Sequence, residues 1–215
     1  MSREAQQARV GGGVALDDLL PGFAGDLGWI HAREGHRGRP YWPGGGSGVT
    51  LDPGFDRGHA GPALFGRLYG PLLPPEGFEA ARRALGKRGE EARAALEGDP
   101  ALRAIRLSAA QALGLMPHTA RPYWEAVSRR FPALAAPGAL PEAQTALLSL
   151  AYNRGPGNEG LEVLRGPLEE RDWAEAARRI GRMQQDHALA GVRRRRREEE
   201  ALILAGLGLA APQGS

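Results

Sequence analysis

The chain has 215 residues, which is enough for one large domain with a substantial hydrophobic core. It contains no cysteine, and this excludes disulfides, thiolate nucleophiles and cysteine-ligated zinc. The formal net charge is +3, and arginine supplies nearly all of the basic side because Lys87 is the single lysine. The sequence pI of about 9.8 favours polyanionic partners such as nucleic acid, anionic lipid or an acidic cell wall.

The two ends of the chain differ in character from its middle. Residues 1–13 are polar and then glycine-rich, which predicts a loose lead-in without the apolar stretch of a secretory signal. We therefore expect synthesis in the cytoplasm and action elsewhere only after release or delivery. A single domain is predicted over residues 14–206, and residues 207–215 are expected to fray. No run of about eighteen or more apolar residues occurs, so no membrane insertion is predicted.

The first predicted helix carries an apolar stripe that ends on a carboxylate. The stripe comprises Phe23, Leu27, Ile30 and Glu34, at spacings of four, three and four. Gly35 then offers a left-handed stop. Glu34 thus follows an apolar face, where burial favours the protonated form of a carboxyl. A general acid needs that environment.

Residues 35–58 are the one segment with strand character. A Gly-Gly-Gly-Ser-Gly run precedes a short apolar stretch around Thr50, and the pattern predicts a β-hairpin. The run Gly44–Gly46 lacks the Lys-Ser/Thr that follows a phosphate-binding loop, so a turn is predicted there. Asp52 and Asp56 come next. Two acids close together on a hairpin beside a cleft suit glycosidic bond cleavage, since one protonates the leaving oxygen and the other aligns water or attacks the sugar.

Everything after residue 58 has helical character, in segments bounded by Gly or Pro. Helices are predicted near 60–70, 77–96, 100–115, 119–131, 141–153, 159–166, 172–185 and 188–206. The fold class is therefore α+β and predominantly helical. A small hairpin subdomain at about 35–58 is expected beside a helical lobe at about 59–206, with a cleft between them.

Several motifs, taken in order, resemble those of pesticin-type lysozymes, relatives of the T-even phage lysozyme in the phage muramidase superfamily. They are Glu34-Gly35, Tyr41 to Pro43, Ser47 to Thr50, Gly54 to Gly58, Ala146 to Gly155, Gly166 to Ala177 and Leu189 to Leu204. The resemblance covers roughly residues 20–206. It implies a lysozyme-like fold and a muramidase that hydrolyses the β-1,4 bond between N-acetylmuramic acid and N-acetylglucosamine, with inversion and without a cofactor.

The resemblance also implies roles for individual residues. Glu34 would be the general acid, while Thr50 and Asp56, six positions apart, would position or activate water. The chain departs from the family pattern at Leu51-Asp52-Pro53, where an apolar residue, a Gly and an aromatic are usual. Asp52 is therefore an alternative second carboxylate, although a turn role before Pro53 is the simpler interpretation. The alternatives are that Asp56 is a helix N-cap and that Thr50 is an ordinary strand residue.

Other candidates are less specific. Tyr41, Asn153 and Arg154 are candidate substrate contacts, and the last two could instead cap the end of an apolar helix. His31 and His36 are spaced by five, which suits no standard helical metal site, so no metal is expected.

The arginine run from Arg193 to Arg197 is the densest charge in the chain. A solvated helix face backed by Glu198–Glu200 is the favoured interpretation, and contact with an anionic wall is the alternative. No aromatic residues interleave, so no nucleic-acid partner is expected.

These patterns leave three functions open. The leading one is a muramidase acting on peptidoglycan glycan strands in phage lysis, with a holin, or as a bacteriocin-like toxin with an immunity protein. The second is a cell-wall-binding module of the same fold with a weakened site, and the third is a nucleic-acid-binding protein that uses the arginine run. A monomer is the default expectation.

Overall fold

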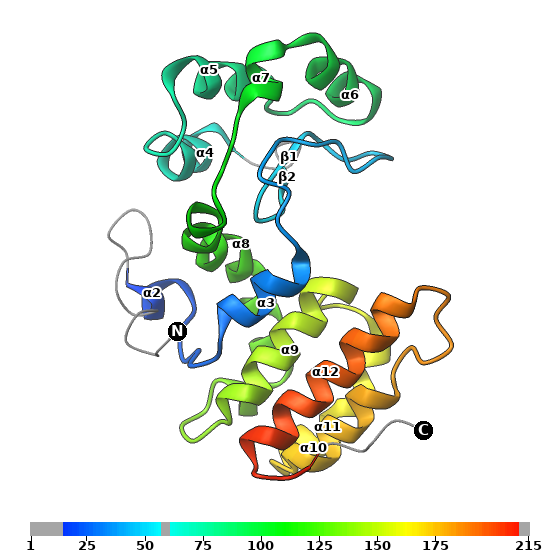
Figure 1. Ribbon diagram of the computed structural model, residues 1–215. Coiled ribbons are helices and arrows are strands. Elements are labelled where there is room, and N and C mark those ends of the chain that lie inside the picture. The colour runs from blue at the N-terminus through cyan, green and yellow to red at the C-terminus, as the bar shows by residue number, and fades with distance from the viewer. Residues whose placement is uncertain (1–14, 57–60, 211–215) are drawn as a thin grey trace. The chain divides into compact units, whose positions relative to one another are not determined.

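The computed structural model describes residues 15–56 and 61–210, and of Phe55 and Asp56 it describes the backbone alone. Over these residues the fold is predominantly helical, as predicted (Figure 1). The predicted lead-in at 1–13 and the tail from 211 lie outside the described residues. The elements are α2 (Leu16–Leu19), α3 (Leu27–Glu34), β1 (Thr50–Leu51), β2 (Phe55–Asp56), α4 (Pro62–Tyr69), α5 (Pro75–Arg83), α6 (Gly89–Gly98), α7 (Pro100–Ala104), α8 (Ala109–Arg130), η1 (Pro132–Leu134), α9 (Pro141–Arg154), η2 (Glu159–Leu164), α10 (Arg165–Glu169), α11 (Trp173–Arg182) and α12 (Ala190–Gly206).

The chain divides into two compact units that interleave along the sequence. Within the described residues, unit 1 takes Ala15 and the stretch Glu34–Thr119, and unit 2 takes Leu16–Arg33 and the stretch from Ala120 onward. Unit 1 thus holds both strands, α4 to α7 and the first half of α8. The predicted parts followed chain order, whereas the structure divides the helices after residue 58 between the two units.

The strands of unit 1 form a very short ladder. β1 and β2 pair antiparallel, with Thr50 opposite Asp56 and Leu51 opposite Phe55. Two residues per strand are too few to be stable by themselves. Burial supplies the missing stability, because Leu51 is completely buried in the core of unit 1. A buried leucine contributes about 1.5–3 kcal/mol.

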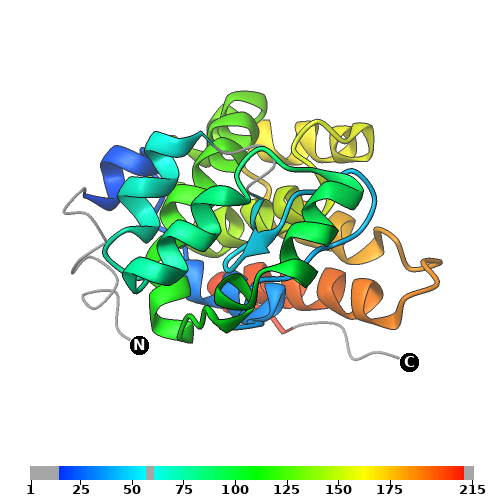
Figure 2. The ribbon, with the colours of Figure 1, turned by 90° about the horizontal axis from the view of Figure 1, so that it is seen from above.

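The glycine-rich run before β1 forms a turn, as predicted. Tyr41 and Thr50 exchange backbone hydrogen bonds of 3.1 and 2.7 Å and so close the loop between them. Inside the loop Gly44 has a φ of 101°, a left-handed value that favours glycine. The Ser47 carbonyl accepts from Gly89 N at 3.0 Å, which ties the loop to the start of α6. Figure 2 shows this loop (blue) running beside α6 (green).

Two helix boundaries in unit 1 differ from the prediction. The segment predicted as one helix at 77–96 is two, α5 and α6, because Gly86 takes a left-handed φ of 76° between them. The helices predicted at 100–115 and 119–131 also have a different boundary, because α7 ends at Ala104 and α8 runs from Ala109 to Arg130. α8 begins after Ser108, which exchanges hydrogen bonds with Gln111 in a capping box, and continues through Pro117.

α9 is the central helix of unit 2. Its residues from Ala143 to Ala151 are all buried, and α12 packs against both α9 and α11 (Figure 1). Gln144 fixes the segment before α3 to α9, since its side chain accepts from Ala24 N at 2.7 Å and donates to Gly22 O at 2.7 Å. The predicted starts and stops hold here: Pro141 occupies the first turn of α9, and Gly155 follows its end with a φ of 83°.

The arginine run on α12 is only partly solvated, so its interpretation as a solvated face is wrong for two of its members. Arg196 and Glu199 are completely buried, and Arg195 is 8% exposed. Glu199 Oε1 accepts from Arg196 Nη2 at 3.0 Å and from the Ser149 hydroxyl at 2.5 Å. Arg195 Nε lies 3.5 Å from the same oxygen and donates to Ser149 Oγ at 3.1 Å. These four residues form the buried charge cluster of unit 2.

The buried charge cluster predicts a pH-dependent stability. Burial raises the pKa of Glu199 from its ordinary value of 4.5 to about 7, against the opposing effects of Arg196, Ser149 and Arg195. A folded-state pKa above the unfolded value gives stability that is complete below pH 4.5 and is lost as the pH rises through 7. The free energy of unfolding should therefore fall between pH 5 and pH 8, by on the order of 2 kcal/mol.

Urea unfolding of the wild type and of Glu199→Gln at pH 5, 6, 7 and 8 measures this effect. The amide does not titrate, so the variant should lack the wild-type decline. Glu79→Gln, which alters an exposed pair with Arg82, is the matched control and should follow the wild type. A wild-type stability that rises over this range relative to Glu199→Gln would mean that the two arginines favour the carboxylate more than burial disfavours it.

Candidate functional site

Glu34 is the last residue of α3, and it begins the stretch of chain that belongs to unit 1. The predicted stop is confirmed, because Gly35 follows with a left-handed φ of 78°. The expected burial is not found, and Glu34 is exposed. The helix presents its buried residues Leu27 and Ile30 to the core of unit 2, whereas its last residue lies beyond that apolar face.

Asp52 connects the segment after Glu34 to the hairpin. It is 4% exposed, and its Oδ2 accepts from the backbone N–H groups of Arg37 at 2.8 Å and Gly38 at 2.5 Å. His36 Nδ1 lies 3.0 Å from the same oxygen. The Asp52 carbonyl accepts from the hydroxyl of buried Tyr69 at 2.9 Å. One carboxylate oxygen with three donors has little capacity left to activate water, so these contacts support the turn role over the alternative catalytic role.

Thr50 and Asp56 occupy facing positions of the ladder, which is the pairing that a shared water site would need. Thr50 is 3% exposed, and its hydroxyl lies 3.4 Å from the Gly48 carbonyl. That separation is long for an O–H···O hydrogen bond. The side chain of Asp56 lies outside the described residues, so its catalytic role and its alternative as an N-cap stay predictions.

Unit 1 therefore brings five of the predicted residues into one stretch of structure. Tyr41 pairs with Thr50 through the backbone, and the Arg37 guanidinium lies over the Tyr41 ring at 3.8 Å. Arg37 in turn donates its N–H to Asp52. Glu34 lies three positions before Arg37 in the sequence.

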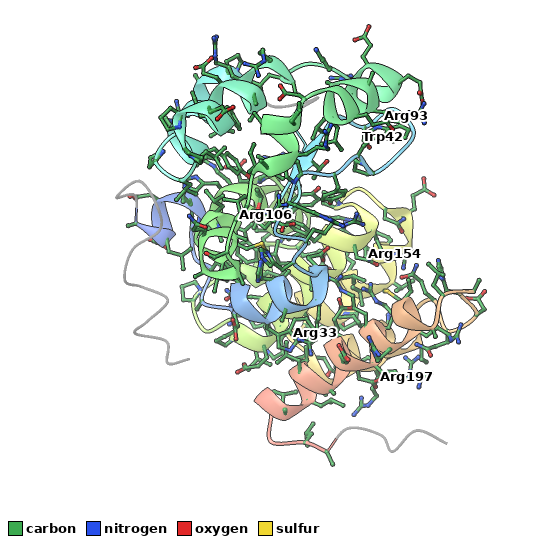
Figure 3. All side chains as sticks on the ribbon, turned by 45° about the horizontal axis from the view of Figure 1, so that its top comes forward. Arg33, Trp42, Arg93, Arg106, Arg154 and Arg197 are labelled. Carbon is green, nitrogen blue, oxygen red and sulfur yellow. The ribbon has the colours of Figure 1, made fainter. Side chains whose placement is uncertain are left out.

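Asn153 and Arg154 belong to unit 2. Asn153 is exposed and lines a pocket of about 530 Å³ between the ends of α9, α3 and the start of α12. Its Oδ1 is 3.4 Å from Arg196 Nη2, which ties the pocket to the buried charge cluster. Arg154 Nη1 lies 3.5 Å from Met183 Sδ (Figure 3). Both residues stay predictions as substrate contacts.

Unit 1 also contains a pocket that the sequence analysis missed, here named the arginine pocket. It has a volume of about 730 Å³ and is lined by five arginines: Arg37, Arg39, Arg93, Arg103 and Arg106. Tyr41 and Trp42 supply aromatic surface, and Figure 3 shows Trp42 and Arg93 close together. A signal was present, because three of the lining residues, Arg37, Arg39 and Tyr41, lie within five positions of one another in the sequence.

Three broader observations complete the description of the site. Among the described residues, no group of three or more histidines, aspartates and glutamates is placed to hold a metal ion. None of the described helices is long and apolar enough to cross a membrane. No protein-family model and no curated protein matches the chain.

The contacts of Asp52 predict how its substitution will act. Asp52→Ala leaves the backbone N–H groups of Arg37 and Gly38 without the buried carboxylate that accepts from them, so it should lower the free energy of unfolding by about 2–4 kcal/mol. Asp52→Asn retains an accepting oxygen and should cost less. Thermal or urea unfolding measures both. If Asp52→Asn instead kept wild-type stability while abolishing activity, Asp52 would be the second catalytic carboxylate and not an anchor.

Proposed function

We propose that the chain is a muramidase that hydrolyses the β-1,4 bond between N-acetylmuramic acid and N-acetylglucosamine in peptidoglycan. The observation that carries the proposal is the arrangement around β1: Thr50 stands opposite Asp56, and Asp52 ties the segment that follows Glu34 to the same strand. A lysozyme-like hairpin subdomain beside a helical bundle, with the cleft between them, belongs to this proposal.

In the proposed reaction Glu34 and Asp56 have opposite tasks. The Glu34 carboxyl gives its proton to the glycosidic oxygen as the bond to the anomeric carbon breaks. A water held by Thr50 and Asp56 attacks that carbon from the opposite face, and its proton passes to the Asp56 carboxylate. The products are two shorter glycans, one with a new reducing end, and the configuration at the anomeric carbon is inverted.

The exposure of Glu34 has a place in this mechanism. A glycan bound over the carboxyl would exclude water from the place where the proton is transferred. The substrate would then supply the burial that the sequence led us to expect from the protein. The Glu34 carboxyl would be shielded from water only while a glycan covers it.

Hydrolysis of purified peptidoglycan tests the proposal. The wild type should clear a suspension and release new reducing ends, and Glu34→Gln should lower the rate by at least about 100-fold, because general acid catalysis contributes roughly 10²–10⁴. Asp56→Asn should also be strongly impaired. Glu79→Gln is the matched control, since it changes an exposed glutamate of the same unit.

Each result has a distinct meaning. Near-wild-type clearing by Glu34→Gln would refute the assignment of the acid. Wild-type protein that sediments with the wall but releases no reducing ends would instead identify a cell-wall-binding module, which the departure at Leu51-Asp52-Pro53 already suggests as the alternative. For an active enzyme, an NMR signal of the α-anomer as the first product would support inversion, and the β-anomer would exclude it.

A further inference from the structure

The described residues that line the arginine pocket carry more positive than negative charge. Among its lining residues the five guanidinium groups face one carboxylate, Glu97, which lies 3.9 Å from Arg93 Nε. Arg93 has a second carboxylate partner in Glu90, at 2.9 Å. The pocket therefore retains the positive charge of the other four arginines.

The hydrogen bonds of these arginines orient the groups without cancelling their charge. Arg106 Nη1 donates to the backbone carbonyls of Arg103 at 2.6 Å and Ile105 at 2.7 Å. Arg103 Nη1 donates to the carbonyls of Leu96, at 3.2 Å, and Glu97. A carbonyl carries no net charge, so both guanidiniums remain able to attract an anion. Arg39 is exposed and makes no hydrogen bond or ion pair with any described residue.

Aromatic surface is built into the same pocket. Trp42 is half-buried, and its Nε1 donates to the Ser47 carbonyl at 3.1 Å, which fixes the ring against the loop that closes at Thr50. Ser47 is itself tied to α6 through Gly89 N. The ring therefore stands on a turn that is anchored at both ends, and it is placed to receive a flat, partly apolar group.

We propose that the arginine pocket binds an acidic saccharide, in which carboxylate or phosphate groups are attached to sugar rings. Guanidinium groups pair with such anions through two parallel hydrogen bonds, and the indole can pack against the C–H face of a sugar ring. The volume of about 730 Å³ falls within the range of small-ligand pockets, which is roughly 300–1,000 Å³. The proposal rests on the proposed function for its setting, since the pocket would then hold acidic groups of the wall glycan near the cleaved bond.

A single-stranded nucleic acid suits the pocket less well. Such a ligand needs a positive groove that follows its backbone and aromatic faces on which successive bases stack. Here the Tyr41 ring is already covered on one face by Arg37, which leaves Trp42 as the aromatic residue free for stacking. The arginine run on α12 belongs to the other unit, and two of its members are buried in the charge cluster.

Isothermal titration calorimetry of the full chain tests the proposal with two oligosaccharides of equal length. Hyaluronan hexasaccharide alternates a uronic acid with N-acetylglucosamine, and chitohexaose is its neutral counterpart. The acidic sugar should bind at least about tenfold more tightly, a difference of about 1.4 kcal/mol. The binding should weaken as salt is raised, because screening reduces the attraction between exposed charges.

Substitutions locate the binding. Arg39→Gln should weaken binding of the acidic sugar by about fivefold or more, and it removes no hydrogen bond or ion pair with a described residue. Trp42→Ala should also weaken binding of the acidic sugar. If loss of the indole loosens the turn, Arg39→Gln still tests the pocket, because its side chain does not hold the turn. Arg67→Gln is the matched control, because Arg67 is an exposed arginine of unit 1 outside the pocket. It should bind like the wild type.

Three results would overturn the proposal: equal affinity for the two sugars, no binding of the acidic sugar, or tighter binding of a single-stranded DNA hexamer with the same dependence on Arg39. Glu34→Gln separates this proposal from the proposed function. It should bind hyaluronan like the wild type while failing to clear peptidoglycan. If it clears the wall and still binds the sugar, the assignment of the acid fails and the saccharide pocket stands.

Discussion

The candidate site depends on one buried carboxylate oxygen. Asp52 Oδ2 accepts from two backbone N–H groups and lies beside His36, so it fixes the turn that follows Glu34 against the hairpin. Hydrogen bonds to charged groups are worth about 1.5–3 kcal/mol each, and a two-residue ladder cannot supply comparable stability. This oxygen and the Tyr41–Thr50 bridge both join the segment from Glu34 to Tyr41 to the region of β1.

Asp52 also lies where the sequence differs from the pesticin-type pattern that motivated the proposed function. A carboxylate at this position raises the question of which aspartate serves as the second acid. Its contacts favour an answer, because a saturated oxygen in a buried turn holds structure more readily than it holds a reacting water. Asp56, which stands opposite Thr50, is then the better candidate. The contacts of Asp52 thus give a physical reason for a carboxylate at this position.

The sequence predicted those helix ends that depend on residues close by in the chain. The stops at Gly35 and Gly155 each depend on residues within a few positions, and both are present. The break at Gly86 was missed because an isolated glycine is compatible with a helix until tertiary packing decides. The burial of Arg195 could not be predicted either, since its partner Ser149 is 46 positions away. The arginine pocket was missed for the same reason, because its members come from 37–42 and from 93–106.

The distribution of charge matters more here than its sum. A net charge of +3 gives no indication of where cations gather, and the run from Arg193 to Arg197 is the most conspicuous candidate in the sequence. Yet Arg195 and Arg196 lie in the interior of unit 2, paired with Glu199 and largely withdrawn from solvent. Less conspicuous arginines in unit 1 are separated in sequence and keep their charge because they contact carbonyls and an aromatic ring. Under the proposal for the arginine pocket, a polyanion is therefore attracted to the dispersed set more than to the contiguous one.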